Sequence, residues 1–271
     1  MAPTSPEHVD IVDQAHEPTE SASTTAGAGA SDSEARRQPE WDVPNLPLVE
    51  ASATDPAELK PTWRGWIHAG TFPVAIAAGI VLICLAHGAP AKWASAVFMA
   101  TSLLLFGNSA LYHRFNWKPR TKKVLKRIDH ANILLLIAGT YTPLGILALP
   151  TQKGIILLSI VWGGALLGIA FRVFWIGAPR WLYVPLYVLL GWAALMYVVD
   201  LVNANPAMMV LVFVGGGLYT LGALVYGLKR PNPFPGTFGF HEIFHTLTVL
   251  AFLCHWTAAL LIVLHPAFHG V

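Results

Sequence analysis

Charged residues are scarce over most of this sequence. Of its 271 residues only 12% are Asp, Glu, Lys or Arg, whereas a soluble domain carries about a quarter. Acidic residues are the scarcest, because the 213 residues after position 58 contain only Asp129, Asp200 and Glu242. Such a long and nearly acid-free stretch excludes an ordinary soluble enzyme and predicts a membrane protein.

Other absences narrow the class of protein further. The only two cysteines, Cys84 and Cys254, lie inside apolar runs, so a disulfide framework is excluded. The basic residues flank apolar runs and do not cluster with aromatic side chains, which argues against a nucleic-acid partner. The last apolar run contains no lysine that could hold retinal as a Schiff base.

The first 62 residues have a different composition from the rest. Residues 1–58 carry 12 acids against two bases, a net charge of −10, and residues 59–271 carry 15 bases against three acids, a net charge of +12. The early segment is rich in Ser, Thr, Ala, Glu and Pro and has no apolar periodicity that could offset chain entropy. We therefore predict a disordered acidic cytoplasmic tail over residues 1–62 and a transmembrane domain over residues 63–271. The tail lacks the pattern of a secretory signal, so the first apolar helix must serve for insertion.

Seven apolar stretches are long enough to cross a hydrocarbon core, which takes about 20 helical residues. They cover residues 66–86, 92–113, 129–149, 154–175, 181–201, 207–228 and 240–264. Gly and Pro residues separate the stretches, as expected for loops. The sequence therefore predicts an all-α integral membrane protein, a bundle of seven transmembrane helices.

The orientation follows from the Lys and Arg residues in the short loops. The second, fourth and sixth loops with their flanks hold 11 basic residues, and the opposite loops hold only Lys92 and Lys153. Basic loops stay on the cytoplasmic side. We therefore predict a multi-pass protein of the plasma membrane with a cytoplasmic N-terminus and an external C-terminus, the reverse of a G-protein-coupled receptor.

Polar side chains gather at three of the predicted cytoplasmic helix ends. Ser109 and His113 are four residues apart at the end of the second span, so they share one helix face. Asp129 begins the third span. His241 and His245, again four residues apart, begin the seventh span. Ionisable groups in spans are costly and usually face a cavity or a partner, so these residues predict a functional site.

The chemistry of this set favours a zinc cofactor. Three neutral imidazoles, His113, His241 and His245, would leave the fourth zinc position open, as in a catalytic site. Asp129 would orient or deprotonate a water molecule, and the Ser109 hydroxyl could donate to a developing oxyanion. We therefore predict Asp129 and Ser109 as the catalytic residues.

A rival hypothesis uses the same helix start. His241, Glu242 and His245 also match the H-E-x-x-H pattern of zinc proteases, in which Glu242 would be the general base. The third ligand is lacking, because nothing extends the motif along the helix and Asp200 is predicted on the outer side. We expect the Glu242 carboxylate instead to interact favourably with the dipole at the start of its helix and to bond a basic residue of a neighbouring loop.

The other histidines receive lesser roles. His68, at the predicted cytoplasmic end of the first span, is expected to support the site from outside the ligand set or to lie at the interface. His255 is about 15 Å beyond His245 along the helix, too far for the same metal. His265 and His269 are expected in the solvated C-terminal tail.

Four stretches also carry a family resemblance. They are Ser109–His113, "RIDHANILLLIAGTYTPL" from Arg127 to Leu144, "YTLGALVYGLKRPNPFP" from Tyr219 to Pro235, and "GFHEIFHTL" from Gly239 to Leu247. In these stretches the sequence resembles the hemolysin III proteins, the bacterial branch of the progestin and adiponectin receptor family. The resemblance spans about residues 62–265 and implies a seven-helix bundle with a cytoplasmic N-terminus and a zinc near the cytoplasmic face.

The resemblance also assigns residues. The family's three histidine ligands fall on His113, His241 and His245, its water-contacting aspartate on Asp129 and its serine on Ser109. The wider superfamily includes alkaline ceramidases, which implies hydrolysis of a lipid amide, and bacterial members are linked to membrane homeostasis. The acidic tail lies outside the resemblance.

Two functions of different classes remain open from the sequence. One is a zinc-dependent membrane hydrolase acting on a lipid amide or ester. The other is a non-catalytic membrane sensor or homeostasis factor in which zinc clamps the second and seventh spans together. Membrane lipids are the expected partners in both cases, and nothing indicates a protein partner.

Overall fold

The structure is a computed structural model that describes residues 61–175, 177 and 179–268. The predicted tail lies outside these residues, except for Pro61 and Thr62. The regular elements of the described part are helices. They are α1 (Trp66–Leu85), α2 (Gly88–Arg114), α3 (Pro119–Leu147), α4 (Thr151–Phe174), α5 (Arg180–Gly191), the 3-10 helix η2 (Ala193–Tyr197), α6 (Val198–Ala204), α7 (Pro206–Leu228) and α8 (Phe240–Leu264).

These elements form the predicted seven spans. Within the described residues, seven helices are long and apolar enough to cross a membrane, with α5, η2 and α6 together making the fifth. The prediction of an all-α integral membrane protein is therefore confirmed. The direction in which the spans cross the membrane stays a prediction.

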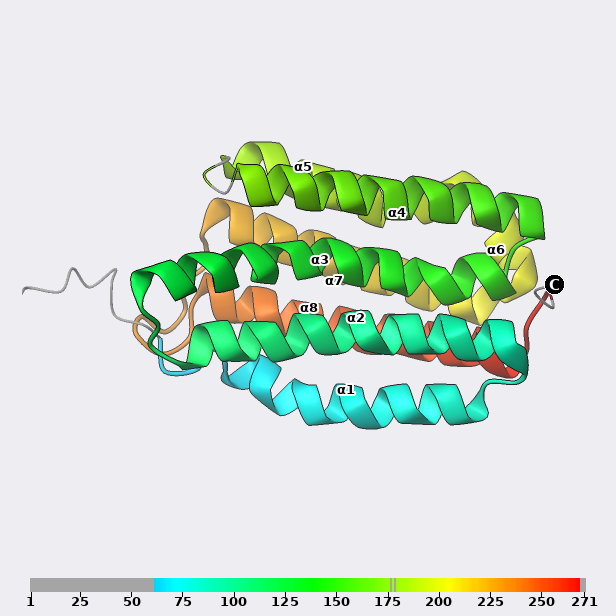
Figure 1. The fold of residues 1–271 in the computed structure, drawn as a ribbon, viewed down its shortest axis with the longest axis horizontal. Coiled ribbons are helices and arrows are strands. Elements are labelled where there is room, and N and C mark those ends of the chain that lie inside the picture. The colour runs from blue at the N-terminus through cyan, green and yellow to red at the C-terminus, as the bar shows by residue number, and fades with distance from the viewer. Residues whose placement is uncertain (1–60, 176, 178, 269–271) are drawn as a thin grey trace, which may run out of the picture. The chain divides into compact units, whose positions relative to one another are not determined.

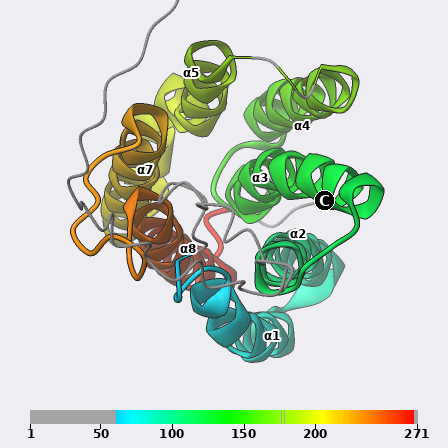
Figure 2. The same ribbon diagram turned by 90° about the vertical axis from the view of Figure 1, so that its left-hand side faces the viewer.

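The helices run side by side along one direction (Figure 1). Viewed from the end, α3 lies against α2, α4 and α8 and is closer to the middle of the bundle than α4 (Figure 2). Close approach of α2 and α3 requires a glycine, since a Cβ on Gly139 would lie 1.9 Å from the Thr101 Oγ1. Small residues permit such contacts in membrane bundles. The central position of α3 brings its Asp129 into the interior of the bundle.

The third span begins earlier than predicted. Its helix starts at Pro119, ten residues before the predicted start at Asp129. Pro119 is in the first turn, where its missing N–H has no helical partner to lose. The basic residues that follow are good helix formers and mostly exposed, so the helix extends beyond the apolar segment.

The fifth span is interrupted, although the sequence predicts one continuous helix over residues 181–201. The α-helix ends at Gly191, and a 3-10 turn precedes α6. Tyr141 of α3 bridges the break, because its hydroxyl donates to the Gly191 carbonyl oxygen over 2.6 Å and accepts from the Ala194 N–H over 2.9 Å. Irregular backbone inside a membrane requires such partners.

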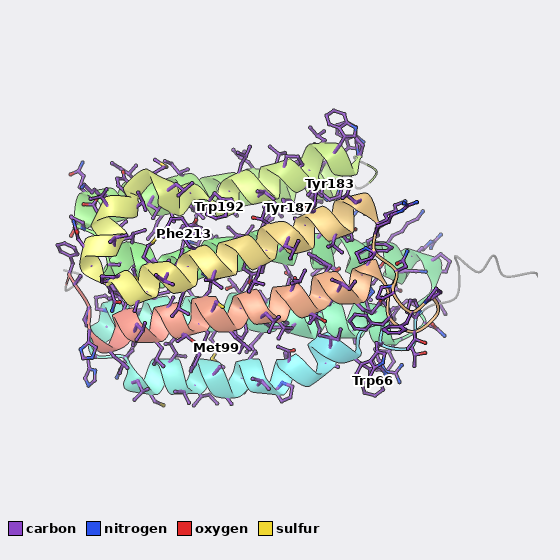
Figure 3. The ribbon with its side chains drawn as sticks, turned by 180° about the vertical axis from the view of Figure 1, so that it is seen from behind. Trp66, Met99, Tyr183, Tyr187, Trp192 and Phe213 are labelled. Carbon is purple, nitrogen blue, oxygen red and sulfur yellow. The ribbon has the colours of Figure 1, made fainter. Side chains whose placement is uncertain are left out.

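Exposed tryptophans lie near the ends of the spans. Trp63, Trp66, Trp93 and Trp181 are all exposed. Figure 3 shows Trp66 at one end of the bundle, whereas Trp192 lies well inside it. Exposed tryptophans at span ends are typical of membrane interfaces.

Candidate metal centre

The ends of α2 and α8 bring three histidines together. His113 lies in the last turn of α2, and His241 and His245 lie in the first two turns of α8. The Nε2 atoms of His113 and His241 are 3.2 Å apart. One ring nitrogen from each of the three histidines lies within 4.8 Å of the others. The structure thus brings together the three residues that the sequence predicts as metal ligands.

His245 has one nitrogen with a partner and one without. Its Nδ1 lies 2.9 Å and 2.8 Å from the two ring nitrogens of His68, which begins α1. Its Nε2 is buried and has no hydrogen-bond partner among the described residues. Metal-ligating histidines usually bond a second group through the other nitrogen, which fixes the ring and its tautomer. His68 takes this supporting position, one of the two locations that the sequence predicts for it.

The three donor atoms fit a metal ion in type and approximately in spacing. Two nitrogens bound to one tetrahedral ion at about 2.0–2.1 Å lie about 3.3 Å apart, close to the 3.2 Å between His113 and His241. The remaining separations are at most 4.8 Å, so a small shift of the His245 ring would complete the ligand set on binding. The unpartnered His245 Nε2 is the clearest sign that the cluster could hold a metal.

Asp129 and Ser109 lie beside the cluster. The Asp129 Oδ2 is 3.7 Å from the His113 Nε2, and the Asp129 side chain is 15% exposed. Ser109 is buried one helical turn before His113. Both residues line a cavity of the bundle together with His68 and His245. The two predicted catalytic residues therefore line the same cavity as His245, whose Nε2 has no partner among the described residues.

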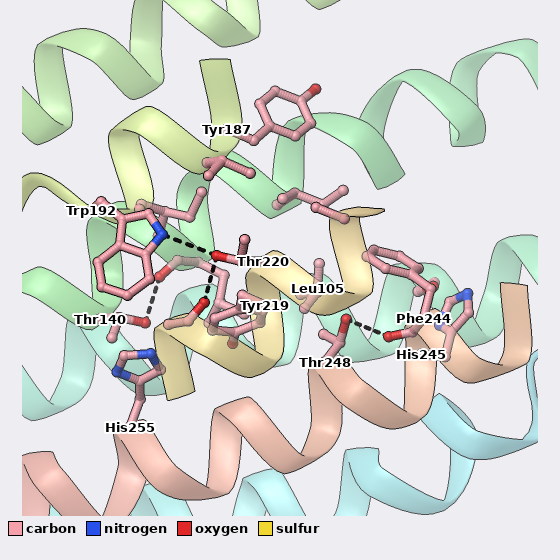
Figure 4. Close-up of a pocket in the computed structure, with 18 of the residues that line it drawn as sticks. Leu105, Thr140, Tyr187, Trp192, Tyr219, Thr220, Phe244, His245, Thr248 and His255 are labelled. Atoms are coloured by element: carbon pink, nitrogen blue, oxygen red, sulfur yellow. Dashed lines mark hydrogen bonds between the residues drawn. The ribbon is translucent and has the colours of Figure 1, made fainter. Parts of the chain in front are cut away.

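The cavity extends from His245 of the cluster into the middle of the bundle. Its walls are predominantly apolar. Helices α1, α2, α3, α5, α7 and α8 contribute to it, and Leu105, Ile133 and Phe244 are among its apolar lining residues. Figure 4 shows that the wall runs from His245 past Thr248 to Trp192 and His255. Such a chamber suits an apolar molecule with a polar end at the histidines.

Glu242 points away from this cavity. One carboxylate oxygen pairs with the Arg64 Nε and the other accepts the Gly239 N–H over 2.9 Å. The segment around Arg64 also bonds the loop before α8 through the backbone, from the Trp63 N–H to the Thr237 oxygen over 3.3 Å. Glu242 is only 1% exposed and is bonded to a basic residue, as predicted. This arrangement is unlike that of the general base of a zinc protease.

Asp200 forms an ion pair in another part of the fold. Its Oδ1 accepts from the Lys153 Nζ over 2.6 Å, where α6 approaches the start of α4. The prediction that Asp200 lies away from the histidine cluster is consistent with this pairing, so the H-E-x-x-H pattern gains no third ligand from it.

Sequence reasoning did not find the residues that line the deep part of the cavity. Trp192 follows the break in the fifth span, and Tyr219 and Thr220 belong to α7. No charged residue indicates either the position of the break or the inward direction of these side chains. The one available signal is a tyrosine and a threonine inside a nearly continuous apolar run.

Comparison with known proteins agrees with the geometry. The family model described as haemolysin-III related matches residues 57–256. The chain is 35% identical to the "Hemolysin-3 homolog" of Bacillus subtilis (strain 168) over 180 residues, which is 65% of this chain and 81% of that protein. It is 34% identical to "Hemolysin-3" of Bacillus cereus over 176 residues, 64% of this chain and 77% of that protein.

A shorter similarity reaches beyond the bacteria. The chain is 45% identical to the "ADIPOR-like receptor IZH2" of Saccharomyces cerevisiae (strain ATCC 204508 / S288c) over 49 residues, 16% of each chain. This agrees with the predicted relationship to the progestin and adiponectin receptors. The family match covers most of the seven-span region and includes all three clustered histidines, so this chain belongs to the haemolysin-III-related family.

Proposed function

We propose that this protein is a zinc-dependent hydrolase of a membrane lipid amide or ester, located in the plasma membrane and contributing to membrane homeostasis. The observation that carries the proposal is the buried His245 Nε2 without a partner, in the wall of an apolar cavity that Asp129 and Ser109 also line. With the N-terminus in the cytoplasm, the reaction would take place near the cytoplasmic face.

His113, His241 and His245 would hold the zinc through their side-chain nitrogens. Imidazole suits zinc, and three protein ligands leave a position for water or substrate. Zinc in such a position supplies a Lewis acid and lowers the pKa of water. His68 would keep the His245 ring in place through the contact at 2.8–2.9 Å.

The chain's own groups would complete the chemistry. The Asp129 carboxylate would accept the proton of the attacking water and later deliver it to the leaving amine or alcohol. The buried Ser109 hydroxyl would donate a hydrogen bond to the oxygen of the substrate carbonyl as negative charge develops there. The apolar walls would exclude other water and bind the lipid chain.

Two conservative substitutions test this proposal. Asp129→Asn should retain zinc, because Asp129 is outside the ligand set, and should lose about 10²- to 10⁴-fold in rate, the usual contribution of a general base. Glu242→Gln is the matched control. It removes a carboxylate that lies within one helix turn of His241 and His245 but does not line the cavity. We expect it to leave both zinc content and lipid turnover in place.

The measurement is zinc content and whole-cell lipid composition for the wild type and both variants at matched expression. A lipid change that disappears with Glu242→Gln alone would contradict the assignment and favour a zinc protease mechanism. If lipid composition is identical in cells with the wild type, with either variant and without the protein, the hydrolase proposal is contradicted and the non-catalytic sensor is favoured. The position of the histidines on α2 and α8 supports that second function, because a bound metal would clamp these two helices.

A further inference from the structure

The deep end of the cavity contains two polar groups that the proposed chemistry does not use. His255 of α8 is 8% exposed, and its Nδ1 has no hydrogen-bond partner in the described part of the chain. The Tyr219 hydroxyl of α7 is likewise buried and without a partner there. The two rings are stacked, with centroids 5.5 Å apart and planes inclined by 18°. Both residues line the cavity.

Packing holds this pair in place. A Cβ on Gly215 would lie 2.7 Å from the His255 Nε2, so the imidazole fits directly against the backbone of α7. One turn later on the same helix, Tyr219 stacks on the imidazole. The pair is therefore a fixed feature of the cavity wall.

Three other polar side chains of this part of the wall have partners. The Thr140 hydroxyl donates to the Leu136 oxygen, and the Thr220 hydroxyl donates to the Gly216 oxygen, both over 2.8 Å. The Trp192 Nε1 donates to the Thr220 Oγ1 over 2.9 Å, as the dashed lines in Figure 4 show. Buried polar atoms in proteins nearly always have a hydrogen-bond partner. Tyr219 and His255 are therefore exceptions that call for a ligand.

The depth of the pair limits the kind of ligand. His255 follows His245 by ten residues on α8, a rise of about 15 Å at 1.5 Å per residue. This is about half of a hydrocarbon core of about 30 Å. A molecule that reaches both ends of the cavity must therefore have a polar head, an apolar middle and a second hydrogen-bonding group.

We propose that the cavity binds a hydroxylated fatty chain, with its head at the histidine cluster and its mid-chain hydroxyl at Tyr219 and His255. A hydroxyl both donates and accepts, which suits a phenol and an imidazole nitrogen together. A hydroxyl on carbon 12 lies about eleven bonds from the carboxyl carbon, or about 14 Å at about 1.25 Å per extended bond. That span matches the depth of the pair. The inference deepens the proposed function, since it names the chain of the substrate.

The test compares equilibrium binding of three fatty acids to the purified, zinc-containing full chain in detergent. 12-Hydroxyoctadecanoic acid should compete about tenfold more strongly than octadecanoic acid, the gain expected from a buried hydrogen bond. 2-Hydroxyoctadecanoic acid, whose hydroxyl is near the head, should bind no better than octadecanoic acid.

Substitutions locate the effect. Tyr219→Phe removes only a hydroxyl that has no partner among the described residues, so it should keep the fold and abolish most of the preference, as should His255→Phe. Tyr197→Phe is the matched control outside the cavity and should leave the preference unchanged. Zinc content and thermal unfolding of each variant show whether it is folded.

Three results would overturn the inference. These are equal affinity of the wild type for the 12-hydroxylated and plain acids, an equal gain for the 2-hydroxylated acid, and a preference that survives Tyr219→Phe and His255→Phe together. Equal affinity for the 12-hydroxylated and plain acids would indicate that buried water, and not a hydroxyl of the ligand, bonds Tyr219 and His255. Because binding requires no turnover, a failure here leaves the hydrolase proposal intact if Asp129→Asn still changes lipid composition.

Discussion

The hydroxyl of Tyr141 should account for a measurable part of the stability of the bundle. Tyr141 is 5% exposed, and its hydroxyl bridges the Gly191 oxygen and the Ala194 N–H at the break in the fifth span. Tyr141→Phe keeps the ring and leaves both backbone groups unpaired. Each unpaired buried group costs about 1–3 kcal/mol, and partial relaxation suggests a total of about 3 kcal/mol.

The assay is thermal unfolding of the purified protein in detergent. At about 2–4 °C per kcal/mol for a chain of this size, Tyr141→Phe should lower Tm by about 6–12 °C. Tyr197→Phe is again the control, because its hydroxyl makes no hydrogen bond within the described residues. A Tyr141→Phe variant that unfolds within about 2 °C of the wild type would refute the argument that this hydroxyl pairs the broken span.

Two further predictions concern the metal and the topology. Replacing His113, His241 or His245 by Ala should reduce bound zinc to well below one per chain, whereas His265→Ala should leave it intact, as measured by elemental analysis. Stoichiometric zinc in the His241→Ala, His245→Ala double variant would eliminate the site. A reporter fused after Val271 should be external and one at the N-terminus cytoplasmic, and a cytoplasmic C-terminal reporter would contradict the orientation.

The spans and the histidine cluster could be predicted from the sequence because each has a strong local signal. Apolar length gives the spans, and i, i+4 spacing places His241 and His245 on one helix face. The chain crosses the bundle four times between Asp129 and His241, and this even number brings Asp129 and His245 to the same end of the bundle. Acidic residues are so rare after position 58 that each of the three can be considered individually as a candidate for a functional role.

The interrupted fifth span and the deep cavity could not be predicted in the same way. The break after Gly191 depends on a hydroxyl of Tyr141, 50 residues away in the sequence. The inward direction of Tyr219 depends on the rotation of α7 against α8, which Gly215 permits. Neither feature produces a repeating pattern in the sequence, because both arise from contacts between different helices.

The order of synthesis follows from the positions of the clustered histidines. His113 and His245 are 132 residues apart, so a ribosome adding roughly 5–20 residues per second completes the cluster roughly 7–26 s after making its first member. Until α8 inserts, His113 and Asp129 have neither His241 nor His245 beside them. Six spans must therefore insert and associate without help from the cluster, and a chain truncated after α7 lacks two of its three histidines. Metal capture by this protein would thus report completed biosynthesis of the whole bundle.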